Sequence, residues 1–374
     1  MPYPLRRRHK AMTLVEIMVV TAIMSLLAVV MVPTVKFQYR NRSVKEGARQ
    51  LNAFISAAQA RAQQLGRPVG IWVERFSKEA PAPIVGANAT LNPTLPVGAN
   101  YSVQIYQAEI PRPYTGDLRD SRVRVIRRGT DWVINFPPTS ALLNANNPLI
   151  REWEPFKIQF DHRGPFHEGE RIADIEAQGP PKRKIPQYIL RPETIRTGGQ
   201  IPKAAFTDAG VPYALHRRPV RSFVTPLRLP QGAVIDLSVS GTGPGGTEFH
   251  STLAAAQRPV VVMFHPDGNI GQVYFGGTVK RPLGWIHLLV GRQEMVFPSN
   301  RLLETETESA NMRYTENRWV SINHRTGTVT SEVLADIGSA MRMLPADQIE
   351  ELKFPDKVGL SRELVRTGTG LEDD

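Results

Sequence analysis

Glu16 is the only charged side chain between Lys10 and Lys36, and it stands near the start of a long apolar run. A carboxylate near the end of a membrane helix costs a few kcal/mol on insertion scales and usually marks a function or a partner. The chemistry it could supply there is to offset a cation in low-dielectric surroundings, such as an amine of a neighbouring chain. The alternative is a side chain that simply reaches the polar interface.

A second group of chemically suggestive residues is basic. Residues 162–220 contain eight prolines and ten lysines or arginines against six acidic residues. The basic clusters in this stretch are Lys182, Arg183 and Lys184, then Arg217 and Arg218. With the formal net charge of +11, they are compatible with an anionic partner such as nucleic acid. A solvated, proline-rich extension explains the same composition, so both interpretations stay open.

The sequence contains no arrangement that meets the requirements of an enzyme active site. The absence of cysteine excludes disulfides, thiolate metal sites and cysteine nucleophiles. Gly241–Gly246 has the spacing of a phosphate-binding loop, but Pro244 lacks an amide that would face the phosphate. His162 and His167 stand in a predicted loop without a cluster of further ligands. We therefore expect no catalytic residue, no metal and no cofactor, and a chain that is not an enzyme.

The element that must position Glu16 is the apolar run itself. Met12–Val35 has 24 residues, and a bilayer core needs about 20 in a helix. A secretory signal peptide would have a shorter apolar core and then a small-residue cleavage site, whereas here a helical pattern continues beyond Pro33. We therefore expect a retained membrane anchor. The basic residues ahead of it are Arg6, Arg7, Arg8 and Lys10.

The sequence around this junction resembles a known leader. Arg6-Arg7-Arg8-His9-Lys10-Ala11 is followed by Met12-Thr13-Leu14-Val15-Glu16 and then the apolar run. This resembles the class III leader of type IV pilins and pseudopilins, with Ala in place of the usual Gly and Met in place of the usual Phe. The resemblance implies that a prepilin peptidase cuts between Ala11 and Met12, that Met12 becomes N-methylated, and that Glu16 serves assembly. It also implies a helix kink at Pro33.

An apolar stripe predicts that the helix continues well beyond the membrane run. Its residues recur at alternating spacings of four and three: Val44, Ala48, Leu51, Ile55, Ala58, Ala62 and Leu65. Gly66 suits the position just after a helix, and Pro68 prevents the helix from resuming. A helix from Met12 to Leu65 would be roughly 80 Å long. Its second half should pack against a globular head.

From Val69 the pattern changes to short β-rich runs separated by turn residues, which predicts an antiparallel sheet. The expected strands are Val69–Val73, Tyr101–Ile110, Arg122–Ile126, Trp132–Phe136, Phe156–Phe160, Ser222–Leu229, Ala233–Val239, Pro259–Phe264, Ile270–Phe275, Trp285–Val290 and Arg318–Ile322. Residues 265–269 and 325–328 predict two hairpin turns. A final helix is expected over Ser331–Leu344.

Motifs in the predicted head make the resemblance more specific. Residues 48–62, followed by the strand at Val69, look like the head entry of pseudopilin H of type II secretion systems and its FimT-like minor-pilin relatives. Residues 229–235, 261–274 and 322–329 fit the same family. The heads of that family are smaller, which implies insertions over residues 76–220.

These patterns predict an α+β fold in which a long transmembrane-to-amphipathic helix packs on an antiparallel, pilin-like sheet head with large insertions. The expected divisions are a leader at 1–11, the transmembrane half of the helix at 12–35, its amphipathic half at 36–66, a β-rich head at 67–330 with insertions at 76–220, a Pro-rich basic stretch at 162–220, and a C-terminal helical extension and tail at 331–374.

The resemblance implies a minor pseudopilin of a type II secretion-like system, which assembles into a pilus-like filament or its tip after leader cleavage. The implied partners are a prepilin peptidase, sibling pseudopilins and an inner-membrane assembly platform. The implied location is the inner membrane, crossed once, with the head in the periplasm. The alternative is a DNA-uptake minor pilin that binds DNA through the basic residues of its head.

Overall fold

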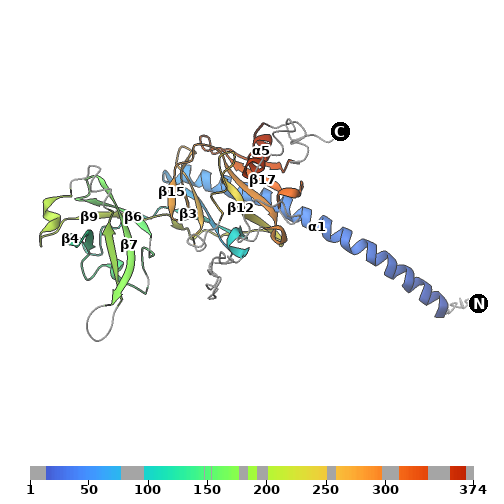
Figure 1. The fold of residues 1–374 in the computed structure, drawn as a ribbon, viewed down its shortest axis with the longest axis horizontal. Helices are drawn as coiled ribbons and strands as arrows, with labels where there is room; N and C mark the ends of the chain where they lie inside the picture. Colours follow the sequence, from blue (N-terminus) through green and yellow to red (C-terminus); the bar gives the residue numbers. More distant parts are fainter. Residues whose placement is uncertain are drawn as a thin grey trace, which may run out of the picture.

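The computed structural model describes residues 14–76, 97–146, 148–152, 154–176, 184–191, 201–250, 258–296, 311–335 and 354–367. The fold is α+β, with one long N-terminal helix, a head made of two antiparallel sheets, and a third antiparallel sheet set apart from the head. These parts follow one another in a row, with the start of the helix at one end and the third sheet at the other (Figure 1).

The long helix, α1, spans Leu14–Leu65. Six of the seven predicted stripe residues are at most 1% exposed, and only Leu65, at the helix end, is 42% exposed. Gly66 follows with φ 61°, as predicted for the residue after a helix. The stripe prediction is confirmed because the buried positions lie on one face of α1, and that face packs on the head.

Sheet A has the order β10-β3-β1-β13-β14-β15, and β11 also pairs with β3. Its strands are β1 (Val69–Glu74), β3 (Gln104–Glu109), β10 (Val220–Arg221), β11 (Leu227–Arg228), β13 (Val260–Phe264), β14 (Ile270–Phe275) and β15 (Thr278–Lys280). Sheet B has the order β18-β17-β16-β12-β2. Its strands are β2 (Tyr101–Ser102), β12 (Ala233–Thr242), β16 (Ile286–Arg292), β17 (Arg318–Ile322) and β18 (Val329–Val333). All these pairings are antiparallel, as predicted for the head.

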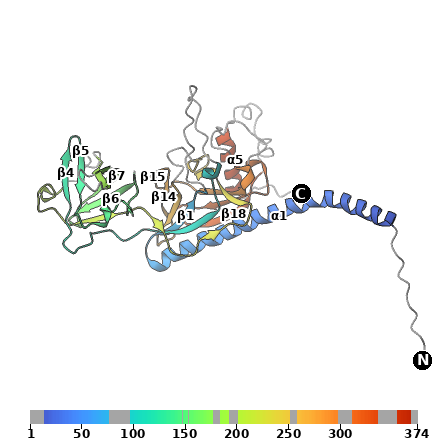
Figure 2. The same ribbon diagram turned by 90° about the horizontal axis from the view of Figure 1, so that it is seen from below.

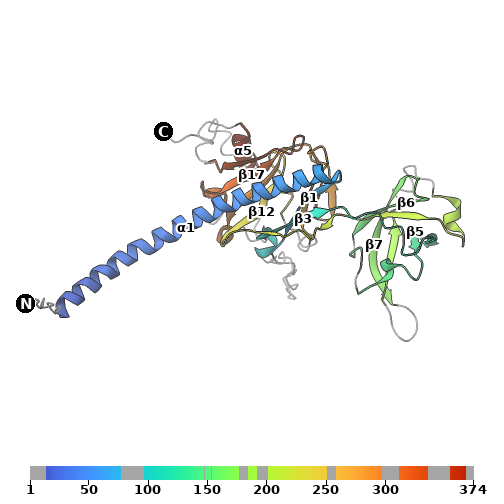
Figure 3. The same cartoon turned by 180° about the vertical axis from the view of Figure 1, so that it is seen from behind.

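Both head sheets share one apolar core with α1, which crosses the head beside β12 and β17 (Figure 3). Strand residues such as Ile71, Val262 and Leu288 meet Leu51 and Ile55 of the helix there. A second helix, α5 (Phe354–Thr367), lies on the other side of the head from α1 (Figure 2). Short 3-10 turns occupy Val97–Asn100, Ala141–Leu143, Lys203–Phe206, Gln293–Met295 and Asn311–Arg313.

Both predicted hairpin turns are present, and one side chain of α1 binds them both. Gln59 Nε2 donates to the carbonyl oxygens of Gly268 at 3.1 Å and of Thr326 at 3.2 Å. Gly268 and Gly327 have φ of 90° and 69°, a conformation that favours glycine. The hairpin ends therefore converge on the helix although they are 209 and 267 residues away from Gln59 in the chain.

The predicted helix over Ser331–Leu344 is wrong at its start. Residues 331–333 belong to β18, which pairs with β17 and places Ser331 opposite Val320. The sheet ladder outweighs the local pattern here, because β18 completes the edge of sheet B beside α1. Residues 336–353 lie outside the described part of the chain.

Sheet C is a separate unit inserted into the head. Its order is β4-β5-β8-β7-β6-β9, and its own core contains Val125, Ile158, Tyr188 and Leu215. Its strands are β4 (Arg124–Arg128), β5 (Asp131–Asn135), β6 (Pro155–Phe160), β7 (Phe166–Glu176), β8 (Lys184–Leu190) and β9 (Tyr213–His216).

The chain leaves the head after β3 and returns at β10, two neighbouring antiparallel strands of sheet A in which Glu109 pairs with Val220. β2 and β3, which fall inside the expected insertion, are strands of the head. Much of the proline-rich basic stretch forms β7, β8 and β9 rather than a solvated extension.

Candidate functional site

The N-terminal part of α1 projects away from the head (Figure 1). Its described side chains are largely apolar and exposed: Leu14, Val15, Ile17, Met18, Val19, Val20, Ile23, Met24, Leu26 and Leu27. The hydroxyls of Thr21 and Ser25 donate back to helix carbonyls, to Met18 at 3.0 Å and to Thr21 at 2.8 Å. Apart from one carboxylate, the side chains of this surface are therefore of two kinds: apolar side chains, and hydroxyls that donate to the helix backbone.

That carboxylate is Glu16, the acidic residue of the first turn of α1, and it is exposed. Its position suits the helix dipole, whose N-terminal end favours negative charge. Ala11 and Met12 lie outside the described residues. Pro33 lies inside α1, where it removes one backbone donor, and the kink there stays a prediction.

Within the described residues, we find no helix that is both long enough and apolar enough to cross a membrane.

The described members of the two basic clusters lie at opposite ends of sheet C. Lys182 and Arg183 lie outside the described residues, and Lys184 begins β8 opposite Glu176 of β7. Arg217 and Arg218 follow β9 at the opposite end of sheet C, where β6 begins and pairs with Glu170 of β7. Six residues of strand separate Glu170 from Glu176, which is roughly 20 Å at 3.3 Å per residue.

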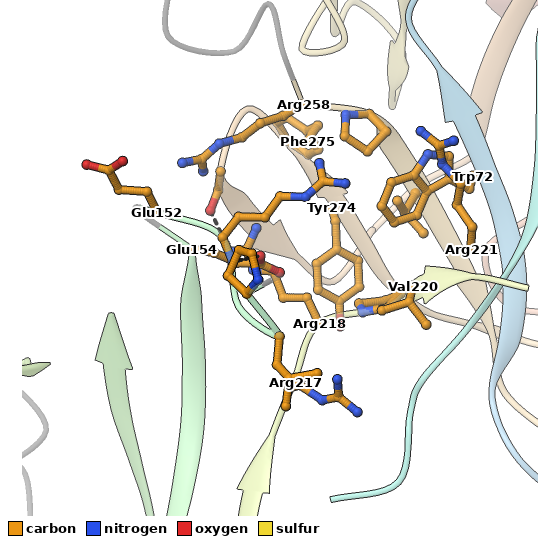
Figure 4. A pocket seen from close by; sticks show the side chains of 17 residues that line it. Trp72, Glu152, Glu154, Arg217, Arg218, Val220, Arg221, Arg258, Tyr274 and Phe275 are labelled. Carbon is orange, nitrogen blue, oxygen red and sulfur yellow. Dashed lines mark hydrogen bonds between the residues drawn. The ribbon is translucent and has the colours of Figure 1, made fainter. Parts of the chain in front are cut away.

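Arg217 and Arg218 instead line a cleft between sheet C and the head (Figure 4). Its volume is about 870 Å³. Three more arginines line it, Arg151 from sheet C's side and Arg221 and Arg258 from the head, together with Glu152 and Glu154. The lining therefore has an excess of positive charge.

Burial lowers the pKa of the Arg217 and Arg218 guanidinium groups, while the charge of Glu154 acts in the opposite direction on both. Arg218 Nη2 donates to the carbonyl oxygen of Gly277 at 2.6 Å, and its guanidinium lies over the ring of Tyr274 at 5.6 Å. These arginines are thus partly removed from water, where an anion would bind them more strongly than at an open surface.

Sequence reasoning missed most of the cleft. Trp72, Arg151, Arg221, Arg258 and Tyr274 come from five distant segments, and no local spacing in the chain signals that they meet. The one available signal was the pair Arg217 and Arg218, which identified one wall.

The described residues contain no group of three metal-binding side chains. His167 is buried in sheet C, 5.2 Å from the ring of Phe160, and burial lowers its pKa. His162 lies in the turn between β6 and β7 with φ 56°.

Comparison with known proteins identifies the N-terminal motif. Residues 6–32 match the model of the prokaryotic N-terminal methylation motif. The match includes Ala11, Met12 and Glu16, and it is consistent with a type IV pilin-like prepilin motif, processing by a prepilin peptidase and assembly with other pilins. No curated protein and no solved structure matches the chain.

Proposed function

We propose that this type IV pilin-like chain is a minor pseudopilin of a type II secretion-like system, which enters a pilus-like filament or its tip after its leader is removed. The methylation motif at residues 6–32 supports this proposal most directly. The same motif leads into α1, whose second half is built into the core of the head. One continuous helix thus joins Leu14, two residues after the proposed new terminus, to the globular part.

The first half of the helix, residues 12–35, is the proposed membrane anchor. Its length matches a bilayer core, and its exposed side chains at residues 14–27 are apolar except for Glu16, Thr21 and Ser25, of which the two hydroxyls donate within the helix. We place the chain in the inner membrane with one crossing and with the head in the periplasm. Its partners in this proposal are the prepilin peptidase, sibling pseudopilins and the inner-membrane assembly platform.

Glu16 is the proposed assembly residue. After cleavage between Ala11 and Met12, the new amine of Met12 lies close to the apolar run. When anchors pack together, that cation enters low-dielectric surroundings, and the carboxylate of a neighbouring chain can offset it. An unpaired charge in such a place would cost several kcal/mol, so the pairing favours one register between neighbouring helices. The role is one of assembly, and we propose no enzymatic activity.

The test replaces Glu16 in the full-length chain produced with its sibling subunits. Glu16→Ala should leave the protein in the membrane and lower its recovery in sheared filaments by at least about tenfold, the factor that 1.4 kcal/mol gives. Glu46→Ala is the matched control, because Glu46 is on the same helix but pairs with Arg49 at the surface. N-terminal sequencing should begin at Met12 in both variants. Normal filament recovery of Glu16→Ala would refute the assembly role.

The alternative function, DNA uptake, gains less support from the arrangement of the basic residues. Lys184 lies at one end of sheet C and Arg217 and Arg218 at the other, so they do not form one continuous track for a phosphate backbone. The arginines of the cleft keep nucleic acid as a candidate ligand, and the oligonucleotide competition described below tests it.

A further inference from the structure

The cleft lies over a row of side chains on the face of sheet A that points away from α1. Tyr106 of β3 pairs with Trp72 of β1, Trp72 with Val261 of β13, and Val261 with Tyr274 of β14. Because side chains alternate along a strand, this row faces opposite to Ile71 and Val73, which belong to the core shared with α1. The four residues form a continuous apolar and aromatic floor across the sheet.

Two arginines cover the ends of this floor: Arg218, from the segment that joins sheet C to the head, and Arg221 of β10. The guanidinium of Arg221 lies 4.6 Å from the ring centre of Tyr106 and 5.5 Å from that of Trp72. Arg218 covers Tyr274 at the other end. Stacking on an aromatic face fixes the plane of a guanidinium. Arg221 also pairs with the carboxylate of Glu74, whereas Arg218 donates to a backbone carbonyl and forms no ion pair with a carboxylate among the described residues.

Two of the five arginines of the cleft, Arg218 and Arg258, lie near Gly277. Arg218 donates to its carbonyl oxygen, and a Cβ placed on Gly277 would lie 2.1 Å from Arg258 Nη1. Both guanidinium groups therefore meet at this glycine. Burial lowers the pKa of Arg218 most strongly. The charge of Glu154 raises this pKa, and the nearby charge of Arg258 lowers it.

Arg217, elsewhere in the cleft lining, has an unsatisfied donor. Among the described residues, the Nε of Arg217 is buried and has no hydrogen-bond partner. A buried donor left without a partner costs roughly 1–3 kcal/mol, and a bound acceptor would remove that cost. Arg217 and Arg218 are both labelled on the same side of the cleft as Glu154 in Figure 4.

We propose that this cleft binds an extended acidic segment of a partner polypeptide, with its carboxylates on Arg217, Arg218 and Arg258. Carboxylates match the forked donors of arginine in bidentate pairs. Glu152 and Glu154 also line the cleft, Glu154 on the same side as Arg217 and Arg218, and they can accept hydrogen bonds from the amides of a peptide backbone. The apolar lining suits the aliphatic parts of such a segment: Pro148, Leu149, Pro219 and Pro259.

A polypeptide fits this cleft better than a nucleic acid. Single-stranded nucleic acids bind by stacking their bases on aromatic rings, whereas Arg218 and Arg221 already cover the rings here.

The test uses the full-length protein in detergent and a fluorescently labelled hexaglutamate peptide, with binding followed by anisotropy. The double variant Arg217→Gln, Arg218→Gln should weaken binding by at least about tenfold, as expected when charge-assisted hydrogen bonds are lost. Arg218→Lys keeps the charge but loses the fork, so it should weaken binding by a smaller factor. Arg217→Gln alone, which replaces the side chain with the unsatisfied Nε, should also weaken it.

The matched control is Arg228→Gln, Arg325→Gln, which removes two exposed arginines outside the cleft. It should change the affinity by less than about twofold at the same salt concentration. Hexaglutamine, with the same backbone and no charge, should not compete. Equal weakening by the control variant, or unchanged binding by the cleft variants, would overturn the proposal. So would tighter, cleft-dependent binding of a thymidine hexanucleotide or of inorganic phosphate than of hexaglutamate.

Discussion

Asp236 gives the head a stability that depends on pH in an unusual direction. This carboxyl lies on β12, fully buried in sheet B. One of its oxygens accepts from the backbone N of Ser238 at 3.0 Å and from the Ser238 hydroxyl, and the other accepts from Asn311 Nδ2 at 2.8 Å. Burial nevertheless raises the pKa of Asp236 to about 6, because these hydrogen bonds only partly offset the loss of water.

The sign of the effect follows from which state binds the proton more tightly. The pKa of Asp236 is about 6 in the folded chain against 3.8 when it is exposed, so between these values the folded state holds more protons. The free energy of unfolding is therefore greatest below pH 4 as far as this group is concerned, and it falls as the pH rises toward 6. The complete loss of stability from low pH to pH 7 is roughly 3 kcal/mol, because each unit of the pKa difference contributes 1.36 kcal/mol. Above pH 7 this group no longer changes the free energy of unfolding.

The measurement compares Asp236→Asn with the unaltered chain in urea titrations from pH 4 to pH 7.5. The buried Trp319 of β17, in the same sheet, reports unfolding by its fluorescence, and Trp319→Phe identifies its contribution. The amide introduced by Asp236→Asn cannot ionise, so the stability difference between the two chains should shift by about 2.4 kcal/mol in favour of the variant from pH 4 to pH 7.5, because the rest of the effect lies below pH 4. A difference that stays constant across this range would show that Asp236 does not titrate there, and would refute the reasoning.

Two further predictions concern the contacts between α1 and the head. Leu51→Ala removes a side chain that is fully buried between the helix and both sheets, and it should lower the free energy of unfolding by about 2–5 kcal/mol. The control Phe223→Ala, at a fully exposed position, should change the free energy of unfolding by less than about 0.5 kcal/mol. Similar losses in both variants would contradict the packing. Gly327→Ala adds a Cβ 2.1 Å from the carbonyl oxygen of Gly268, so it should cost more than the roughly 1–2 kcal/mol of backbone strain alone. Gly129 has a similar φ, and a Cβ added there meets no atom within 4 Å, so Gly129→Ala measures the backbone strain by itself. Equal losses of stability in urea titrations of the two variants would contradict the close approach at Gly327.

The sequence was most informative where one local rule governs a whole element. The apolar stripe of α1 needs only the helical period, and the burial of Val44 through Ala62 follows it residue by residue. The two hairpin turns could be predicted from their glycines alone. The arrangement of β10 beside β3 could not be predicted in this way, because these strands are brought together across the whole of the intervening sheet C.

Sheet C shows why composition misleads in this chain. Prolines and basic residues made residues 162–220 resemble an extension, yet Tyr188, Tyr213 and Leu215 from this stretch are core residues. Strands β8 and β9 have only three buried positions each, alternating in β8 and consecutive in β9, and the prolines stand largely between the strands rather than in them. Such strands become recognisable only when their partners are known, since cross-strand pairing supplies the stability that local propensity lacks.

The contacts of Glu109 connect α1 with the proposed peptide cleft. Glu109 ends β3, where the chain leaves for sheet C, and its carboxylate pairs with Arg61 of α1 at 2.8 Å and with Arg67 just beyond it at 2.7 Å. The hydroxyl of Ser222, which follows β10, donates to the same carboxylate. The end of α1 is therefore bound to both strands at which sheet C is inserted. Because Arg218 and Arg221 lie on the returning segment, the orientation of the cleft is fixed relative to the helix that we place in the filament.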